Sequence, residues 1–127
     1  MEGNLGLNLL YVEDNRDLRE AISAVLAGEG YDVDVAECAD EGLRRLRERR
    51  FDLVISDYAL PDHTGAWMLR EAAARGLLDC TETLIVTANP HPDDAGDTPV
   101  LEKPLDMARL LAWVERLLDP ERTLDRA

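Results

Sequence analysis

The fold class is first indicated by the stretch Leu7-Asn8-Leu9-Leu10-Tyr11-Val12-Glu13-Asp14-Asn15. Its first six residues are almost all apolar, as in a strand buried inside a sheet, and they give way at once to carboxylate and amide side chains. Asn15 is a residue type that caps helices. The apolar residues from Leu18 to Leu26 then recur at helical spacing. A buried strand followed directly by an amphipathic helix is typical of an α/β protein.

The same pattern continues along the chain. Residues 32–36 alternate polar and apolar, as an edge strand does. Further strands are predicted over 51–56, 83–86 and 100–101, and further helices after a capping Asp40, over 67–75, and after a capping Asp106. Strands that alternate with helices predict a parallel sheet covered on both faces. The length of 127 residues suits one domain, with its core at about 7–119 and a polar tail at 120–127.

Composition excludes several classes of function. The net charge of −13 repels phosphate backbones and anionic lipid, so we expect binding to neither nucleic acid nor membranes. The apolar runs are also far shorter than the ~20 residues of a spanning helix. With no signal-peptide pattern, we expect a reducing, cytoplasmic compartment. Cys38 and Cys80 lack metal-site spacing, and we predict that both are free and buried as small hydrophobic side chains.

Polar residues fall at the ends of four predicted strands. They are Glu13 and Asp14 after the first strand, Asp57 after the third, Thr87 after the fourth and Lys103 after the fifth. The carboxyl ends of parallel strands form one rim of a sheet, and ligands of such folds bind there. Taken singly, each residue is explained as a helix cap or a solvated side chain. Five of them at consistent strand ends predict a functional site.

The residue types at this rim indicate phosphoryl chemistry. Three carboxylates close together repel one another unless a cation joins them. Oxygen ligands without histidine or cysteine favour Mg²⁺ over zinc. Asp57 would then be a nucleophile that forms an aspartyl phosphate. Lys103 would pair with one phosphate oxygen, and Thr87 would donate a hydrogen bond to another.

The sequence resembles the receiver domains of two-component response regulators over essentially its whole length. The matching stretches are 9–15, Asp57-Tyr58-Ala59-Leu60-Pro61-Asp62-His63-Thr64-Gly65, Val86-Thr87-Ala88 and Lys103-Pro104. The resemblance implies a flavodoxin-like fold with strand order 2-1-3-4-5. It implies direct Mg²⁺ ligation by Asp14, Asp57 and the backbone carbonyl of Ala59, with Glu13 acting mainly through water. It also implies a cis Lys103–Pro104 bond. The implied partners are a histidine kinase or histidine phosphotransfer protein as donor and an unidentified downstream protein.

The chain departs from that family in two places. Only residues 88–98 separate the fourth strand from the fifth, and they are rich in proline and aspartate with almost nothing apolar. We therefore expect the family's fourth helix to be absent or reduced to a turn. The family usually places an aromatic residue three positions before the lysine, where this chain has Val100. Both changes predict an unusual route for the signal.

Two other classes fit part of the pattern. A hydrolase of the haloacid dehalogenase type also uses a nucleophilic aspartate in an α/β sheet. It needs a second acid two residues later, where this chain has Ala59, which can neither give nor accept a proton. A pseudo-receiver that binds partners without phosphorylation is the alternative that the missing helix leaves open. The intact set of acidic residues argues against it.

Overall fold

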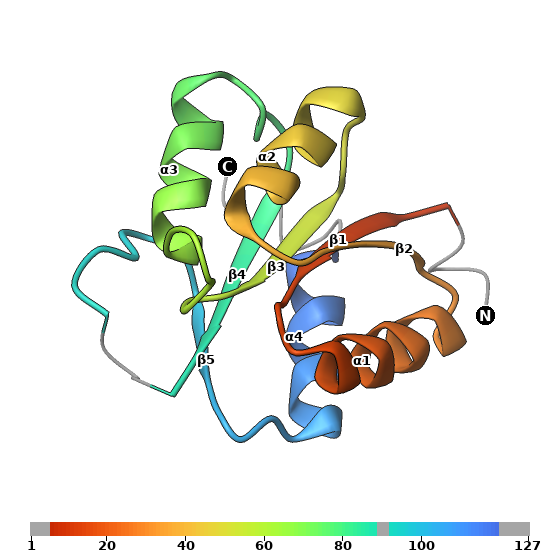
Figure 1. Cartoon of the computed structure of the whole chain (residues 1–127). Coiled ribbons are helices and arrows are strands. Elements are labelled where there is room, and N and C mark those ends of the chain that lie inside the picture. The colour runs from red at the N-terminus through yellow and green to blue at the C-terminus, as the bar shows by residue number, and fades with distance from the viewer. Residues whose placement is uncertain (1–5, 89–91, 120–127) are drawn as a thin grey trace.

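The computed structural model describes residues 6–88 and 92–119. Within them a five-stranded parallel sheet has the order β2-β1-β3-β4-β5, as expected (Figure 1). The chain has the predicted α/β, doubly wound, flavodoxin-like fold, with strands and helices alternating until β4. The elements are β1 (Asn8–Val12), α1 (Arg16–Gly28), β2 (Asp32–Ala36), α2 (Ala39–Glu48), β3 (Leu53–Asp57), α3 (Gly65–Ala74), β4 (Glu82–Thr87), β5 (Val100–Glu102) and α4 (Met107–Leu117).

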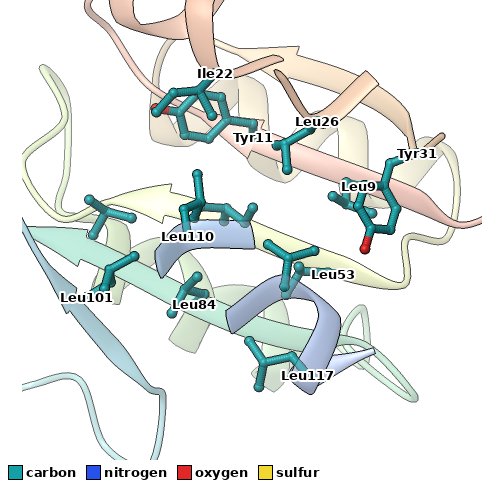
Figure 2. Close-up of a cluster of buried hydrophobic side chains, with 13 residues drawn as sticks. Leu9, Tyr11, Ile22, Leu26, Tyr31, Leu53, Leu84, Leu101, Leu110 and Leu117 are labelled. Atoms are coloured by element: carbon teal, nitrogen blue, oxygen red, sulfur yellow. The ribbon is translucent and has the colours of Figure 1, made fainter. Parts of the chain in front are cut away.

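The core consists of two layers of apolar side chains, one on each face of the sheet. Successive residues of a strand point to opposite faces, so β1, β3 and β4 supply both layers. Helices α1 and α4 cover one face, and α2 and α3 cover the other (Figure 1). Figure 2 shows the first layer, in which strand residues meet the inner faces of α1 and α4. Its labelled members include Leu9, Tyr11, Leu53 and Leu84 from the strands and Ile22, Leu26, Leu110 and Leu117 from the helices.

Two of the three predicted helix caps are confirmed. The Asn15 side chain accepts a hydrogen bond from the Leu18 N–H at 3.0 Å. The Asp106 side chain accepts bonds from two N–H groups in the first turn of α4. The prediction for Asp40 is wrong, because α2 begins at Ala39, so that the residue before the helix is Cys38, two positions ahead of Asp40. The first N–H groups of α2 bond instead to the carboxylate of Asp62, from the loop after β3.

The segment between β4 and β5 carries no regular helix in its described residues, 88 and 92–99. This confirms the expected loss of the family's fourth helix for that part of the segment, and the label α4 here belongs to the helix after β5, the last one within the described residues. The Lys103–Pro104 bond after β5 is cis, as the resemblance implies. In the described ranges no helix has the length and apolar character needed to cross a membrane. The predicted tail at 120–127 lies outside the described residues.

The prediction that both cysteines are buried is wrong. Cys38 is half-buried, and Cys80 is exposed. Cys80 has a φ of 62° in the turn between α3 and β4. Such turns run over the surface, since buried loop backbone would leave its polar groups without partners. The third helix also begins at Gly65 rather than at Trp67, because the Thr64 side chain caps it by accepting the Trp67 N–H at 3.0 Å.

Gly65 lets α3 start directly against the end of β3. A Cβ built there would overlap the Asp57 carbonyl oxygen and lie 2.6 Å from Ser56 Oγ. We predict that Gly65→Ala destabilises the fold by about 1–3 kcal/mol, because backbone must shift to make room. Gly28→Ala is the matched control, since a Cβ at Gly28 meets nothing within 4 Å. Urea denaturation measures both, and equal stabilities of the two variants would contradict this account.

Candidate functional site

The predicted polar residues lie together at one rim of the sheet. Each of Glu13, Asp14 and Asp57 offers a carboxylate oxygen, and these three atoms all lie within 4.8 Å of one another. The Lys103 Nζ lies 3.2 Å from Asp57 Oδ2 and 3.7 Å from Glu13 Oε1. Thr87 is buried at the end of β4, and its carbonyl accepts a hydrogen bond from the Lys103 N–H at 2.8 Å. The parallel strands therefore bring three acids, an ammonium and a threonine to one place.

The two acids after β1 differ in their surroundings. Glu13 is only 2% exposed, because its N–H bonds to the Ala36 carbonyl at 3.0 Å and so continues the pairing of β1 with β2. Its carboxylate accepts hydrogen bonds from the Asn15 N–H at 3.0 Å and the Tyr11 hydroxyl at 3.4 Å. Asp14 is exposed. One acid is thus fixed inside the rim, and the other faces solvent.

Burial raises the pKa of the Glu13 carboxyl. The hydrogen bond from the Asn15 N–H opposes this, the negative charge of Asp57 adds to it, and Lys103 lowers the pKa again. Burial likewise raises the pKa of Tyr11, and the neighbouring Glu13 charge reinforces the shift. Tyr11 therefore keeps its proton and remains a hydrogen-bond donor to Glu13.

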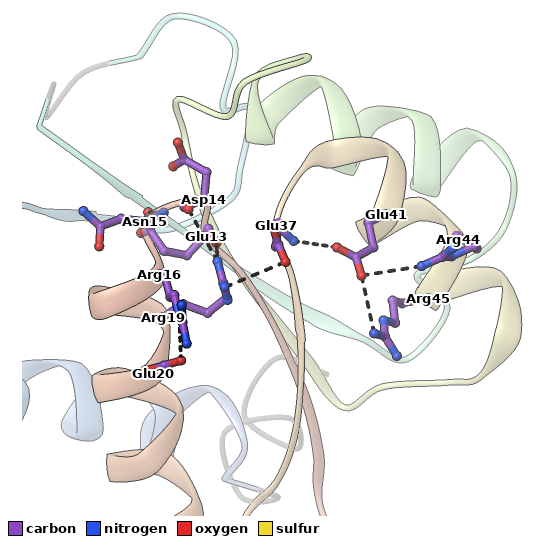
Figure 3. A network of polar contacts seen from close by, with 10 residues as sticks. All are labelled: Glu13, Asp14, Asn15, Arg16, Arg19, Glu20, Glu37, Glu41, Arg44 and Arg45. Carbon is purple, nitrogen blue, oxygen red and sulfur yellow. Dashed lines mark hydrogen bonds and ion pairs between the residues drawn. The ribbon is translucent and has the colours of Figure 1, made fainter.

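Arg19 is a residue of this site that the sequence analysis missed. Its Nη1 donates to the carbonyls of Glu13 at 3.0 Å and Asp14 at 3.4 Å, and its Nη2 lies 3.8 Å from Glu37 Oε2 (Figure 3). Its side chain is only 12% exposed. Arg19 thus ties the backbone of the acidic pair to α1. The available signal was its position one helical turn after the Asn15 cap, on the side of the helix near the strand ends.

Tyr58 links the site to the segment that replaces a helix. It follows Asp57 directly, and its hydroxyl donates to Asp94 Oδ1 at 2.8 Å. Arg70 of α3 donates to the Asp94 carbonyl at 3.2 Å and lies 3.4 Å from Asp94 Oδ2. The hydrogen bond from Tyr58 lowers the pKa of Asp94, with Arg70 acting in the same direction. The loop 92–98 is therefore held to α3 and to the residue after β3 through Asp94.

A second acidic group lies beside α2, but it has a structural explanation. Asp40, Asp62 and His63 are close enough to share a cation, and all three are exposed. The Asp62 carboxylate already accepts the N–H groups of Ala39, Asp40 and His63 at 2.9 Å each. These bonds lower the pKa of Asp62 against the opposing effect of burial. This group joins the loop after β3 to the start of α2.

Comparison with known proteins shows the family. The family model for the response regulator receiver domain matches residues 9–115 of this chain. The chain therefore belongs to the response regulator receiver domains, which are phosphoacceptor signalling modules of two-component systems.

Individual relatives agree with this assignment. The transcriptional regulatory protein DltR of Streptococcus agalactiae is 35% identical over 127 residues, which cover 95% of this chain and 55% of DltR. The chain thus spans about half the length of that relative. The chemotaxis response regulator CheY4 of Vibrio cholerae has a TM-score of 0.81 at 29% identity, over 88% of this chain and 98% of CheY4. TrrA of Thermotoga maritima, solved in complex with Mg²⁺-BeF, has a TM-score of 0.78 at 27% identity, over 88% of this chain and 99% of TrrA.

The residues at the rim fit a divalent cation. Three carboxylate oxygens converge without any histidine or cysteine, which is the donor set that Mg²⁺ prefers. Lys103 places one positive charge between two of these acids. A bound cation would compensate the charge of the remaining acid and of an incoming phosphate.

We predict that Glu13→Gln stabilises the cation-free chain at neutral pH. Because the folded state raises the pKa of Glu13, the native chain binds its proton at a higher pH than the unfolded chain does. The stability of the wild type therefore falls as pH rises from about 4.3, the ordinary pKa of glutamate, through the raised value. The variant lacks this loss, so its advantage should vanish below that window. Urea denaturation against pH in EDTA tests this, and a less stable variant at pH 7 would contradict it.

Proposed function

We propose that Asp57 is the phosphoacceptor of this receiver domain and that Lys103, Thr87 and a bound Mg²⁺ assist the transfer. The observation that carries the proposal is the position of the Lys103 Nζ, 3.2 Å from Asp57 Oδ2 and 3.7 Å from Glu13 Oε1. An ammonium between two acids can pass from a carboxylate oxygen to a phosphoryl oxygen without leaving the rim. We infer that a single domain over residues 1–127, with its core at about 7–119, carries this chemistry.

The transfer follows from the position of the Asp57 carboxylate at the end of β3. A carboxylate oxygen of Asp57 attacks the phosphorus of a phosphohistidine on a donor protein. The new O–P bond forms as the P–N bond breaks, and the imidazole leaves with the electron pair of that bond. Asp57 is only 6% exposed, so the donor must deliver the phosphoryl group from the open side of the rim.

The surrounding residues hold the phosphoryl oxygens and the metal ion. Lys103 holds one phosphoryl oxygen by charge, and the Thr87 hydroxyl donates a hydrogen bond to another. Asp14, Asp57 and the backbone carbonyl of Ala59 would hold Mg²⁺, with Glu13 acting mainly through water. The ion supplies positive charge against the phosphoryl oxygens. Arg19 keeps the two acids after β1 in position through their carbonyls.

The partners follow from the chemistry of the family. We infer that a histidine kinase or a histidine phosphotransfer protein donates the phosphoryl group, and that a downstream protein recognises the modified surface. The relative DltR is a transcriptional regulatory protein. This chain corresponds to about half of DltR's length, so a similar output is an inference about a longer protein. The role is that of a switch, whose only chemistry is the gain and loss of its own phosphoryl group.

We predict one phosphoryl adduct when the chain is treated with acetyl phosphate and Mg²⁺. The adduct should be absent without Mg²⁺, because the single charge of Lys103 compensates only part of the charge of three acids, and the remainder repels the donor. It should also be absent in Asp57→Ala. Asp79→Ala is the matched control, since Asp79 is an exposed acid in the turn before β4, at the opposite end of that strand from Thr87. Intact mass spectrometry measures the adduct. An equal yield in Asp57→Ala would move the site elsewhere, and no adduct in the wild type would favour the pseudo-receiver.

We predict that residues 88–98 change most on phosphorylation. Any movement of the backbone after Asp57 pulls on Tyr58, and Tyr58 holds the loop through Asp94. Amide exchange with and without beryllofluoride measures this. Tyr58→Phe should speed exchange in the loop even without the phosphate mimic, whereas Tyr31→Phe, in the core layer on the other face, should not. Changes confined to α1 and α4 would show this route to be wrong.

A further inference from the structure

An apolar groove lies between α3, β4 and the loop 92–98. Its volume is about 270 Å³, and it lies on the face of the sheet that α2 and α3 cover. Its lining differs from that of the carboxylate rim, because most of the groove's wall is hydrocarbon. Its apolar lining consists of Ala66, Leu69, Ala73, Leu78, Ile85 and Ala95.

The polar side chains of this groove already have partners in the chain. Thr81 Oγ1 donates to the Phe51 carbonyl at 2.7 Å. Thr83 Oγ1 donates to Thr98 Oγ1 at 3.3 Å, and Arg70 is held by Asp94. An occupant therefore finds hydrocarbon rather than open hydrogen-bonding groups. Binding pockets for small molecules usually span ~300–1,000 Å³ with a few convergent polar groups, so this groove suits apolar side chains better than a cofactor.

The architecture points to a helix as the occupant. Parallel sheets are normally covered by helices on both faces. On one face α1 and α4 do this, and on the other α2 and α3 do (Figure 1). On this second face, beyond α3, the described residues that pack over β4 and β5 come from the turn after α3 and from the loop 92–99, neither of which has a regular helix. The groove lies where this cover of the sheet is incomplete. There the side of α3 and the face of the sheet form two walls against which a helix can pack.

The charge beside the groove selects a basic partner. Residues 92–98 contain three aspartates and neither lysine nor arginine. Asp93 and Asp97 are exposed. Arg70 of α3 is paired with Asp94, and Arg75, which follows α3, is paired with Glu71 at 3.2 Å. In a chain with a net charge of −13, this wall attracts lysine and arginine and repels acidic partners.

We propose that this groove is the docking site for a basic amphipathic helix of a partner protein. The helix inserts an apolar side chain between α3 and β4 and places lysine or arginine against Asp93 and Asp97. This is the helix-in-groove mode of recognition. The inference rests on the proposed function only in that the receiver signals by contact, and docking can be measured whatever Asp57 does.

The test is a titration of the ¹⁵N-labelled full chain with a synthetic peptide of leucine and lysine at helical spacing. The expected result is chemical-shift change concentrated in α3, β4 and residues 92–98. Ala73→Trp fills the groove from an exposed position of α3 and should weaken binding about tenfold, the worth of one buried apolar side chain. Ala74→Trp, exposed on α3 but outside the groove, should leave the affinity unchanged.

Two further arms separate the alternatives. A peptide with glutamate in place of lysine should not bind, and the double variant Asp93→Asn/Asp97→Asn should weaken binding of the lysine peptide. Equal affinity of the two Trp variants, or shifts spread over other acidic surfaces, would overturn the proposal. The titration is repeated with Asp57→Ala and without any phosphodonor. If the peptide binds but the wild type forms no phosphoryl adduct, docking stands and the phosphoacceptor role is rejected. If the wild type forms the adduct but the peptide does not bind, the phosphoacceptor role stands and docking is rejected.

Discussion

The repulsion between carboxylates at the ends of parallel strands is the constraint on which the site depends. The pairing of β1 with β3 and of β3 with β4 fixes where the backbone of Glu13 and Asp57 must lie, so these acids cannot move apart. Both are buried, which strengthens every charge interaction between them. The fold relieves part of the repulsion with Lys103 and holds the acidic loop with Arg19. The site can consequently accept a bound cation, and it can accept a phosphoryl group together with that cation.

The two faces of the sheet serve different purposes. The layer beneath α1 and α4 is a continuous apolar core, which holds β1, β3 and β4 in register (Figure 2). The opposite face has a loop where another helix would complete the cover. That loop is tied to the residue after Asp57 by a single carboxylate, Asp94. A chain with this arrangement can change its surface by releasing a loop, with no need to shift a packed helix.

The sequence predicted those features that depend on local pattern. Neighbouring residues were enough to predict the alternation of elements, the caps at Asn15 and Asp106, and the polar strand ends. The strand order came from the family resemblance. Features that join distant segments were missed. Asp62 caps α2 across a separation of more than twenty residues, so Asp40 looked like the local cap. Cys80 looked like a core residue by type, although its left-handed turn places it at the surface. The bond from Tyr58 to Asp94 spans 36 positions, and no periodicity in the sequence indicates it.

A crystal structure of the chain grown with Mg²⁺ and beryllofluoride would show whether Asp57 is the phosphoacceptor. The account predicts a fluoroberyllate group on a carboxylate oxygen of Asp57, with Lys103 and Thr87 contacting its fluorine atoms. It also predicts a cation among Asp14, Asp57 and the Ala59 carbonyl. A fluoroberyllate group on another residue would contradict the account. So would an unmodified Asp57, still paired with Lys103, at saturating concentrations of both reagents.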